Sequence, residues 1–419
     1  MSAGKVRIVG GGLTGVLAAF EAHRLGCRDI ELHERFDRLG GVALPRAAHG
    51  LELREGCIYF GPPGDPMRVL FEGHGLAFED FENRFGSVSP APGDDLTFVR
   101  DFGGPALPTR TLALGEGIGE TLTDRLRAYP KEIAEPLRRY CQWHLGTWLD
   151  EVHESAAIPM AINRVYPLGP PAAEIAALKR SDPLHDELYA IPRALWGRLN
   201  NLTASLPQDG FSAFFERCRR KLEGLGVKVF DTALVSPRQA LAAREPGETL
   251  VWAANPMPLF KAVGLEAPKL VKKSFATYVF KARYGGHLPF YAQNFTARGS
   301  VFRVYLYESR GETLLLAECV AECGDAELRR EIHRLMSGFA GAGLSIGEQV
   351  GQNLAPRWIY QSVEAMRGLK TLRASLARSM GAAFVPGAWE PYAKAEKFAE
   401  VNAGLAAALQ SAPAAATAA

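Results

Sequence analysis

Apolar and glycine-rich stretches alternate along the first forty residues in an order that predicts strand, turn, helix and strand. A short apolar run at residues 6–9 ends at a glycine cluster. An apolar pattern of helical period follows over residues 16–25, and a second strand pattern covers residues 29–33. Strands and helices alternate in this way in α/β proteins, so we expect this segment to begin a parallel sheet.

The glycines between the first strand and the helix have the spacing G-x-G-x-x-G. They are Gly10, Gly12 and Gly15, with Leu13 and Thr14 at the start of the helix. In this motif the first glycine permits a tight turn, the second lets the backbone approach a diphosphate, and the third lets the helix pack closely on the strand. The free amide groups of the helix N-terminus then face the phosphates. We therefore expect these five residues to bind a dinucleotide.

An acidic residue ends the second strand, where a dinucleotide site needs one. Glu34 comes nineteen residues after Gly15, close to the ~20 expected for an acid that accepts hydrogen bonds from the ribose hydroxyls. Arg35 beside it leaves NADP open, because an arginine there can hold a 2′-phosphate. A glycine-rich turn without a ligand is the other interpretation, but strand, helix and acid in the right order favour a dinucleotide.

The segment that begins at Glu34 narrows the choice of cofactor. Residues 34–41 have the form E-x-x-x-x-x-G-G, with Gly40 and Gly41 as the glycine pair. This resembles the N-terminal FAD signature of the flavin amine oxidase, protoporphyrinogen oxidase and UDP-galactopyranose mutase superfamily. The resemblance implies FAD rather than NAD, with the glycine pair close to the cofactor diphosphate. It also implies an α/β fold, in which a discontinuous Rossmann-type FAD-binding domain carries an α+β substrate domain.

Later segments continue the resemblance in the same order. In the superfamily, a loop like the one at Tyr59 runs beside the flavin, although a plain strand before a Pro-Pro loop is the alternative here. The backbone of a strand end like Val235 pairs with the adenine. Ala253 resembles the small residue that ends a later strand near the cofactor, and Gly387 resembles the glycine of the C-terminal cofactor segment. The acid expected after that glycine is Ala388 in this chain, which departs from the pattern.

The resemblance also divides the chain into domains. It assigns residues 1–85, 200–260 and 370–410 to the FAD-binding domain and residues 86–199 and 261–369 to the substrate domain. The Ala-rich tail at residues 411–419 has the composition of a disordered segment. A second glycine-rich turn at residues 338–347 lacks both a preceding strand and an acid, so we expect no second dinucleotide site.

Strand patterns of period two dominate after residue 273. In the strand at residues 301–307, Arg303, Tyr305 and Tyr307 fall on one face. An arginine beside aromatic hydroxyls can bind an anionic or polar substrate, and in the superfamily a sheet at this place covers the flavin. These three residues and Tyr59 are therefore our candidates for the substrate pocket. A solvent-exposed sheet face covered by tyrosine rings is the alternative.

Composition limits the classes of function. Of 419 residues, 47% are hydrophobic and 22% are charged, which is typical of a globular enzyme with a sizeable core. The formal net charge of +2 gives no reason to expect binding to nucleic acid or to an anionic membrane. The sequence has no apolar run of about eighteen residues and no signal peptide pattern, so we expect a cytoplasmic protein. The six cysteines and nine histidines show no zinc-binding spacing, so we expect no metal.

Three functions are consistent with these features. The first is an FAD-dependent oxidoreductase, in which a C–H bond next to N or O of a small polar substrate gives a hydride to the flavin. The second is a non-redox flavoenzyme like UDP-galactopyranose mutase, in which Arg303 neutralises the diphosphate of a nucleotide sugar. The third is an FAD-binding protein without catalysis, which the altered segment at Ala388 favours. The catalytic residues and the oligomeric state stay open.

Overall fold

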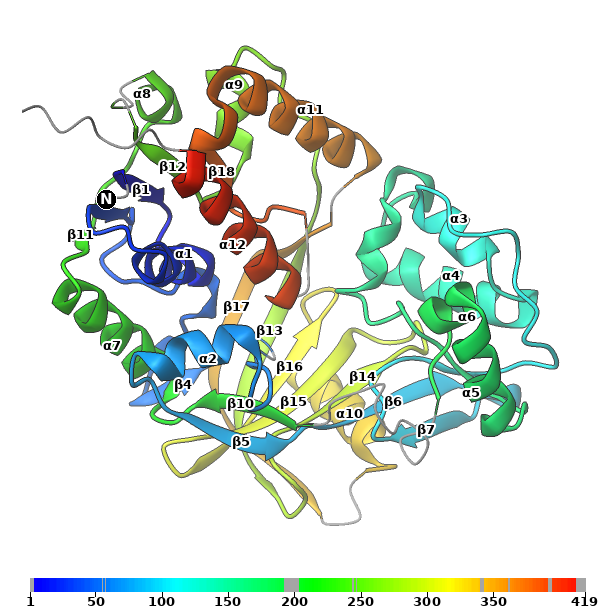
Figure 1. Cartoon of the computed structure of the whole chain (residues 1–419). Helices are drawn as coiled ribbons and strands as arrows, with labels where there is room; N and C mark the ends of the chain where they lie inside the picture. Colours follow the sequence, from blue (N-terminus) through cyan, green and yellow to red (C-terminus); the bar gives the residue numbers. More distant parts are fainter. Residues whose placement is uncertain are drawn as a thin grey trace, which may run out of the picture.

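Two sheets organise the protein (Figure 1). The computed structural model describes residues 4–54, 56, 58–191, 203–242, 245, 247–339, 343–360, 362–390 and 394–411. A parallel sheet with helices on both faces forms one unit, and a larger mixed sheet with a group of helices beside it forms the other. This arrangement confirms the α/β class that the sequence predicts, with a Rossmann-like sheet joined to a mixed one.

The parallel sheet brings together strands from the beginning, middle and end of the chain. Within the described residues its order is β11-β2-β1-β12-β18, and every neighbouring pair is parallel. The strands are β1 (Val6–Val9), β2 (Ile30–His33), β11 (Lys228–Phe230), β12 (Thr249–Trp252) and β18 (Phe384–Pro386). Strands β1 and β12 lie at the centre and are mostly apolar and buried, as is usual for parallel strands that helices cover on both faces.

Successive residues of the central strands point to opposite faces of this sheet. Ile8 and Val251 pack in the cluster of one face, and Val9 and Trp252 pack in the cluster of the other. The first face carries α1 (Leu13–Arg24), α7 (Gly210–Gly224) and α12 (Lys394–Ser411). The second face carries α8 (Pro237–Ala242), α9 (Met257–Ala262) and α11 (Val363–Met380). The unit is therefore a three-layer α/β sandwich.

The mixed sheet has the order β17-β13-β16-β15-β14-β6-β7 in the described part of the chain. Its strands are β6 (Arg84–Pro90), β7 (Leu96–Arg100), β13 (Val271–Tyr284), β14 (Phe290–Asn294), β15 (Val301–Ser309), β16 (Glu312–Cys319) and β17 (Leu344–Tyr360). Helix α10 (Asp325–Met336) covers one face, where Leu328 and Ile332 pack in one cluster with Val304 and Leu306.

Two structures share the opposite face of the mixed sheet. The hairpin of β3 (Arg46–Ala48) and β4 (Leu51–Leu53) packs its leucines against β15 and β16, and a helical unit packs against Phe275 and Phe302. The helical unit consists of β8 (Ala106–Pro108), α3 (Leu122–Arg127), α4 (Lys131–Leu145), β9 (Tyr166–Leu168), α5 (Ala172–Ser181) and α6 (Pro183–Leu188). The boundary between hairpin and helical unit thus lies on this face.

A few smaller elements complete the fold. They are α2 (Pro66–Gly73) and the antiparallel pair of β5 (Phe78–Glu82) and β10 (Thr203–Pro207), together with short 3₁₀ turns such as η1 (Gly41–Ala43). The sequence expectations include neither β17 nor α11. No helix within the described ranges combines the length and the apolar character that crossing a bilayer requires.

Candidate functional site

The glycine turn between β1 and α1 uses each glycine for a different reason. Gly10 has φ of +103°, a conformation that side chains disfavour. A Cβ on Gly15 would come 1.8 Å from the Gly10 carbonyl oxygen, so no side chain fits between helix and turn. A Cβ on Gly12 would meet nothing within 4 Å. Gly12 therefore borders open space, as expected for the position that approaches a diphosphate.

The N-terminus of α1 is free of the side chains that usually cap a helix. Gly12 is the N-cap residue, no side-chain hydrogen bond caps the helix, and its first turn has no acidic residue. Leu13 and Thr14 begin the helix and are half-buried. The first amide groups of a helix carry partial positive charge and attract anions when no side chain occupies them. This helix end can therefore hold a phosphate.

Glu34 lies beside the glycine turn at the end of β2. Its carboxylate is buried and accepts hydrogen bonds from the backbone amides of Gly11 at 2.6 Å and Phe36 at 2.9 Å. Because a carboxylate has about four lone-pair positions, two backbone bonds leave capacity for ribose hydroxyls. Arg35 is exposed, and its guanidinium lies 4.5 Å from the centre of the Phe36 ring.

The glycine pair of the signature lies directly on the glycine turn. The Gly40 amide donates to the Gly11 carbonyl at 2.8 Å, and Gly40 forms a parallel bridge with Gly12. A Cβ on Gly41 would lie 3.1 Å from the Gly12 Cα. The two glycine segments therefore meet through backbone alone, and together they make a wall without side chains.

The middle and C-terminal segments reach the same edge of the parallel sheet. The Ala253 amide donates to the Val9 carbonyl at 2.9 Å, directly after β12. A Cβ on Gly387, which follows β18, would come 2.4 Å from the Ala253 Cα. Residues that the sequence analysis took from three distant segments thus converge at the carboxyl ends of β1, β12 and β18. Ligands of open α/β sheets bind at this edge.

The strand region that we expected to end near Val235 is not a strand in the structure. β11 stops at Phe230, and the next residues leave the sheet because Thr232 has φ of +51°. The chain then continues beside the acid, since the Ala233 amide donates to the Glu34 carbonyl at 2.8 Å. Val235 lies in this irregular segment and is half-buried. The expectation of a strand that ends at Val235 is therefore wrong.

Apolar side chains around this edge are exposed to an unusual degree. Leu234 is 82% exposed, Val42 is 94% exposed and Phe36 is 55% exposed. Phe36 comes shortly after the acid, Val42 directly follows the glycine pair and Leu234 comes after β11. All three therefore lie near the candidate nucleotide site. A bound nucleotide would shield such side chains from water, which gives their exposure a reason.

The C-terminal segment departs from the resemblance in its charge. Ala388, where an acid is expected, is buried with φ of +56°. The Lys397 ammonium from the start of α12 donates to the Ala388 carbonyl at 3.3 Å, and burial lowers the pKa of Lys397. The glycine turn, the uncapped helix and Glu34 fit the nucleotide half of FAD, whereas this segment places a cation beside the position where we expected an acid.

A row of polar residues crosses the mixed sheet on the face shared by the hairpin and the helical unit. Gln293, Arg303 and Glu318 are cross-strand neighbours on β14, β15 and β16. Arg303 forms an ion pair with Glu318, whose side chain is 1% exposed. The Gln293 amide donates to the Tyr140 hydroxyl of α4 at 3.0 Å. Because Glu318 compensates its charge, Arg303 is less suited to an anionic ligand than the sequence suggested.

Tyr305 and Tyr307 are fully buried. Their rings stack with centres 5.0 Å apart, and they pack in one cluster with Leu51 and Leu53 of the hairpin. Tyr59 lies beside them, with its ring centre 6.2 Å from that of Tyr305. The alternative of a solvent-exposed sheet face is therefore wrong, since the β3–β4 hairpin covers this part of the sheet.

Arg54 lies among these tyrosines, although it is not one of the expected site residues. Its Nη1 donates to the Tyr305 hydroxyl at 3.2 Å, and its backbone amide donates to the Tyr307 hydroxyl at 3.0 Å. Its guanidinium carbon lies 4.9 Å from the centre of the Tyr307 ring. No sequence motif marks Arg54, because the tyrosines that define its surroundings come from a distant strand.

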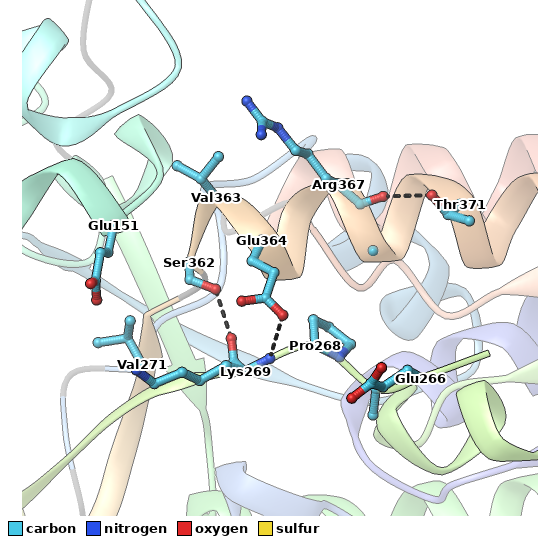
Figure 2. A pocket seen from close by; sticks show the side chains of 12 residues that line it. Glu151, Glu266, Pro268, Lys269, Val271, Ser362, Val363, Glu364, Arg367 and Thr371 are labelled. Atoms are coloured by element: carbon cyan, nitrogen blue, oxygen red, sulfur yellow. Dashed lines mark hydrogen bonds between the residues drawn. The ribbon is translucent and has the colours of Figure 1, made fainter.

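A cavity of about 600 Å³ lies away from these residues, between α11 and the helical unit (Figure 2). Glu151, Glu266, Lys269 and Arg367 are among the residues that line it. Ser362 and Lys269, which also line the cavity, are joined by a hydrogen bond that the Ser362 hydroxyl donates to the Lys269 carbonyl at 2.7 Å. No residue of the glycine turn or the tyrosine cluster contributes to its walls, so this cavity is distinct from the candidate cofactor site.

Comparisons with known proteins agree with this geometry. Residues 8–72 match the sequence family described as the NAD(P)-binding Rossmann-like domain. No curated protein gives a significant match. The structure of reduced UDP-galactopyranose mutase superposes with a TM-score of 0.65 at 11% identity, over 98% of this chain and 96% of that one.

Two further solved structures share the fold. A protein from Exiguobacterium sp. 255-15, provisionally assigned as a protoporphyrinogen oxidase, gives a TM-score of 0.59 at 15% identity over 98% of this chain and 99% of that one. A redesigned putrescine oxidase gives 0.54 at 15% identity over 98% of both chains. At these identities the similarity establishes the fold and leaves the reaction to be argued from the site.

Proposed function

Because the chain joins a dinucleotide-binding Rossmann unit to a mixed sheet in the flavin amine oxidase-like fold, we propose that it is an FAD-dependent oxidoreductase. Its substrate is a small polar molecule that loses a hydride from a C–H bond next to N or O. The observation that carries the proposal is the convergence of Gly12, Glu34, Gly41 and Gly387 at one edge of the parallel sheet.

These residues have separate tasks in holding the cofactor. The backbone of the glycine turn and of Gly41 faces the diphosphate, and the free amides at the start of α1 bind its charge. Glu34 accepts from the ribose, and the segment after β11 lies beside the adenosine. When bound, FAD supplies the hydride acceptor, so the protein contributes binding, orientation and exclusion of water.

The substrate lies at the face of the mixed sheet that carries Tyr305 and Arg303, beside Tyr59. The hairpin and the helical unit already bury most of this face, which keeps water away from the reacting bond. The buried pair of Arg303 and Glu318 holds the polar row in a fixed position and presents no net charge. This environment favours a substrate that the protein orients through hydrogen bonds.

A first experiment tests the cofactor. The absorbance spectrum of the freshly purified protein, with mass spectrometry of the small molecule that it releases, should show a flavin and the mass of FAD. A protein that is colourless and that NAD or NADP stabilises against heat would contradict the proposal. Bleaching of the flavin spectrum by candidate amines and alcohols in the absence of oxygen then identifies the substrate.

A second function is a mutase-like reaction without net redox change on a nucleotide sugar. Arg54 favours it, because this cation without a carboxylate partner among the described residues can bind a substrate diphosphate. Such an enzyme should act only after dithionite reduces the flavin, whereas an oxidoreductase should act on the oxidised form. An FAD-binding protein without catalysis, which Ala388 favours, should bind FAD and show neither behaviour.

A further inference from the structure

We propose that Arg54 binds an anionic group of the substrate, a carboxylate or a phosphate, at the junction of the parallel-sheet unit and the mixed sheet. This inference rests on the proposed function and adds the chemical class of the substrate. It also moves the anion-binding role from Arg303, to which the sequence analysis assigned it, to a residue on the loop after β4.

Arg54 carries a positive charge that no carboxylate of the described residues balances. Every polar contact of Arg54 in the described structure is to a tyrosine hydroxyl, and no carboxylate pairs with it. Arg303 has a buried carboxylate partner in Glu318. A guanidinium stays protonated in proteins, and placing such a charge away from water is costly unless an opposite charge meets it. Among the described residues near the tyrosine cluster, no carboxylate therefore balances the charge of Arg54.

Arg54 also has a hydrogen-bond donor without a partner. The Nε atom of Arg54 is buried and has no hydrogen-bond partner. Buried donors in native proteins nearly always have partners, because an unmade bond costs free energy. The guanidinium offers several donors in one plane, which match the two oxygens of a carboxylate or phosphate. A bound oxyanion would satisfy both the charge and the donor.

The tyrosines around Arg54 stabilise its charge and its position. Burial by itself lowers the pKa of Arg54, but the hydroxyls of Tyr305, Tyr307 and Tyr59 raise it above its ordinary value. The guanidinium also lies over the Tyr307 ring at 4.9 Å and over the Phe211 ring of α7 at 5.9 Å. These contacts fix the arginine in place and keep it charged, so it is ordered before any ligand binds.

The position of Arg54 in the fold agrees with a role toward the substrate. The glycine turn and the start of α1 already supply the groups for the cofactor diphosphate. Arg54 instead lies where β4 leads toward Tyr59, against the face of the mixed sheet that carries Tyr305. An anion held there lies at the covered sheet face and apart from the glycine turn.

Calorimetric titration of the purified protein with benzoate, phenyl phosphate and benzamide tests the proposal. Benzamide has nearly the shape of benzoate without its charge, and phenyl phosphate separates a phosphate site from a carboxylate site. We expect the protein to bind one of the two anions at least about tenfold more tightly than benzamide. Equal binding of benzamide and both anions, or no binding of any of them, overturns the proposal.

Variants assign the effect to Arg54. In Arg54→Met the preferred anion should bind at least about tenfold more weakly, and in Arg54→Lys the loss should be smaller because the charge remains. Arg84→Met is the matched control, since Arg84 is a partly exposed arginine of β6 that pairs with Glu82. Unchanged anion affinity in Arg54→Met, or equal loss in Arg84→Met, contradicts the assignment.

A bromide soak keeps the test independent of whether the variants fold. In crystals of the unaltered protein, anomalous scattering should place a bromide ion at the Arg54 guanidinium, and a map without a peak there overturns the proposal. The flavin spectrum reports separately on the cofactor. A protein that contains FAD but has no anion at Arg54 refutes only this inference, whereas a protein without FAD refutes the proposed function.

Discussion

Arg303 and Glu318 form an ion pair between neighbouring strands in the interior of the protein. The Glu318 side chain is 1% exposed and the Arg303 side chain is 12% exposed. The pair lies on the sheet face between the leucines of the hairpin and the phenylalanines that contact the helical unit. Each charge depends on the other, because water reaches neither freely.

Removing one partner of this pair should therefore be strongly destabilising. Glu318→Ala removes the carboxylate that pairs with the buried arginine, and we expect the free energy of unfolding to fall by about 3–5 kcal/mol. Urea unfolding followed by circular dichroism measures the change. Glu308→Ala, at an exposed position of the neighbouring strand β15, is the control and should change the free energy by less than about 0.5 kcal/mol. A loss below 1 kcal/mol for Glu318→Ala would show that water relieves the buried charge.

Two alanine substitutions in the glycine turn should have opposite consequences. Gly15→Ala places a Cβ 1.8 Å from the Gly10 carbonyl oxygen, so we expect a loss of about 1–3 kcal/mol of unfolding free energy. Gly12→Ala meets no protein atom within 4 Å, so the protein should stay folded but lose most of its FAD affinity. Thermal unfolding and flavin content, measured on both variants, separate the two effects. Normal FAD content in Gly12→Ala would mean that the diphosphate lies elsewhere.

Glu34 should contribute to cofactor affinity through both of its contacts. Glu34→Ala removes the acceptor for the ribose and also releases the amides of Gly11 and Phe36. We expect FAD to bind at least about tenfold more weakly, measured by equilibrium dialysis of the apoprotein. Asp37→Ala is the control, because its side chain is 82% exposed on the same loop. Stoichiometric FAD in Glu34→Ala would refute the ribose assignment.

His144 should make the protein sensitive to acid. Burial lowers the pKa of His144 from 6.5 to about 3, with smaller contributions from the charges of Lys273 and Arg303. The unfolded chain therefore binds a proton at higher pH than the folded chain does. The stability contributed by the neutral imidazole is complete above pH 6.5 and is lost as the pH falls from there toward 3.

The variant His144→Leu isolates this effect. Below pH 6.5 its unfolding free energy should fall less steeply than that of the unaltered protein, by about 1.4 kcal/mol for each pH unit. Urea unfolding at pH 7, 6 and 5 measures both slopes, and the other titrating groups cancel in the comparison. Parallel slopes would show that His144 is protonated in the folded protein.

The parts of the site that depend on local sequence could be predicted. Gly10, Gly15 and Glu34 lie within one strand–turn–helix–strand segment, so their spacing alone indicates a dinucleotide site. The environment of Arg54 could not be predicted in this way. Its partners Tyr305 and Tyr307 come from a strand some 250 residues later, and no local pattern reports which charged side chain lacks an opposite charge.

The mixed sheet, too, could be predicted only where the pattern of a single strand is sufficient. The alternation in β15 shows that Tyr305 and Tyr307 share a face, but only the packed structure shows that Leu51 and Leu53 cover it. β17 was missed because Gly347 and Gly351 interrupt its pattern, whereas its pairing with β13 stabilises it along its length. α11 carries an apolar stripe at Leu369, Leu372 and Leu376, so its signal is present in the sequence and was overlooked.

The order of strands in the parallel sheet has a consequence for synthesis of the protein on the ribosome. β12 is translated after β1 and β2, and β18, which pairs with β12 and carries the chain to Gly387, is translated long after β12. Until then the growing polypeptide exposes β12 as an open sheet edge, a surface on which strands of other chains can pair. Closure of the cofactor edge therefore waits for the synthesis of β18, and a chain that terminates before β18 keeps an unprotected strand.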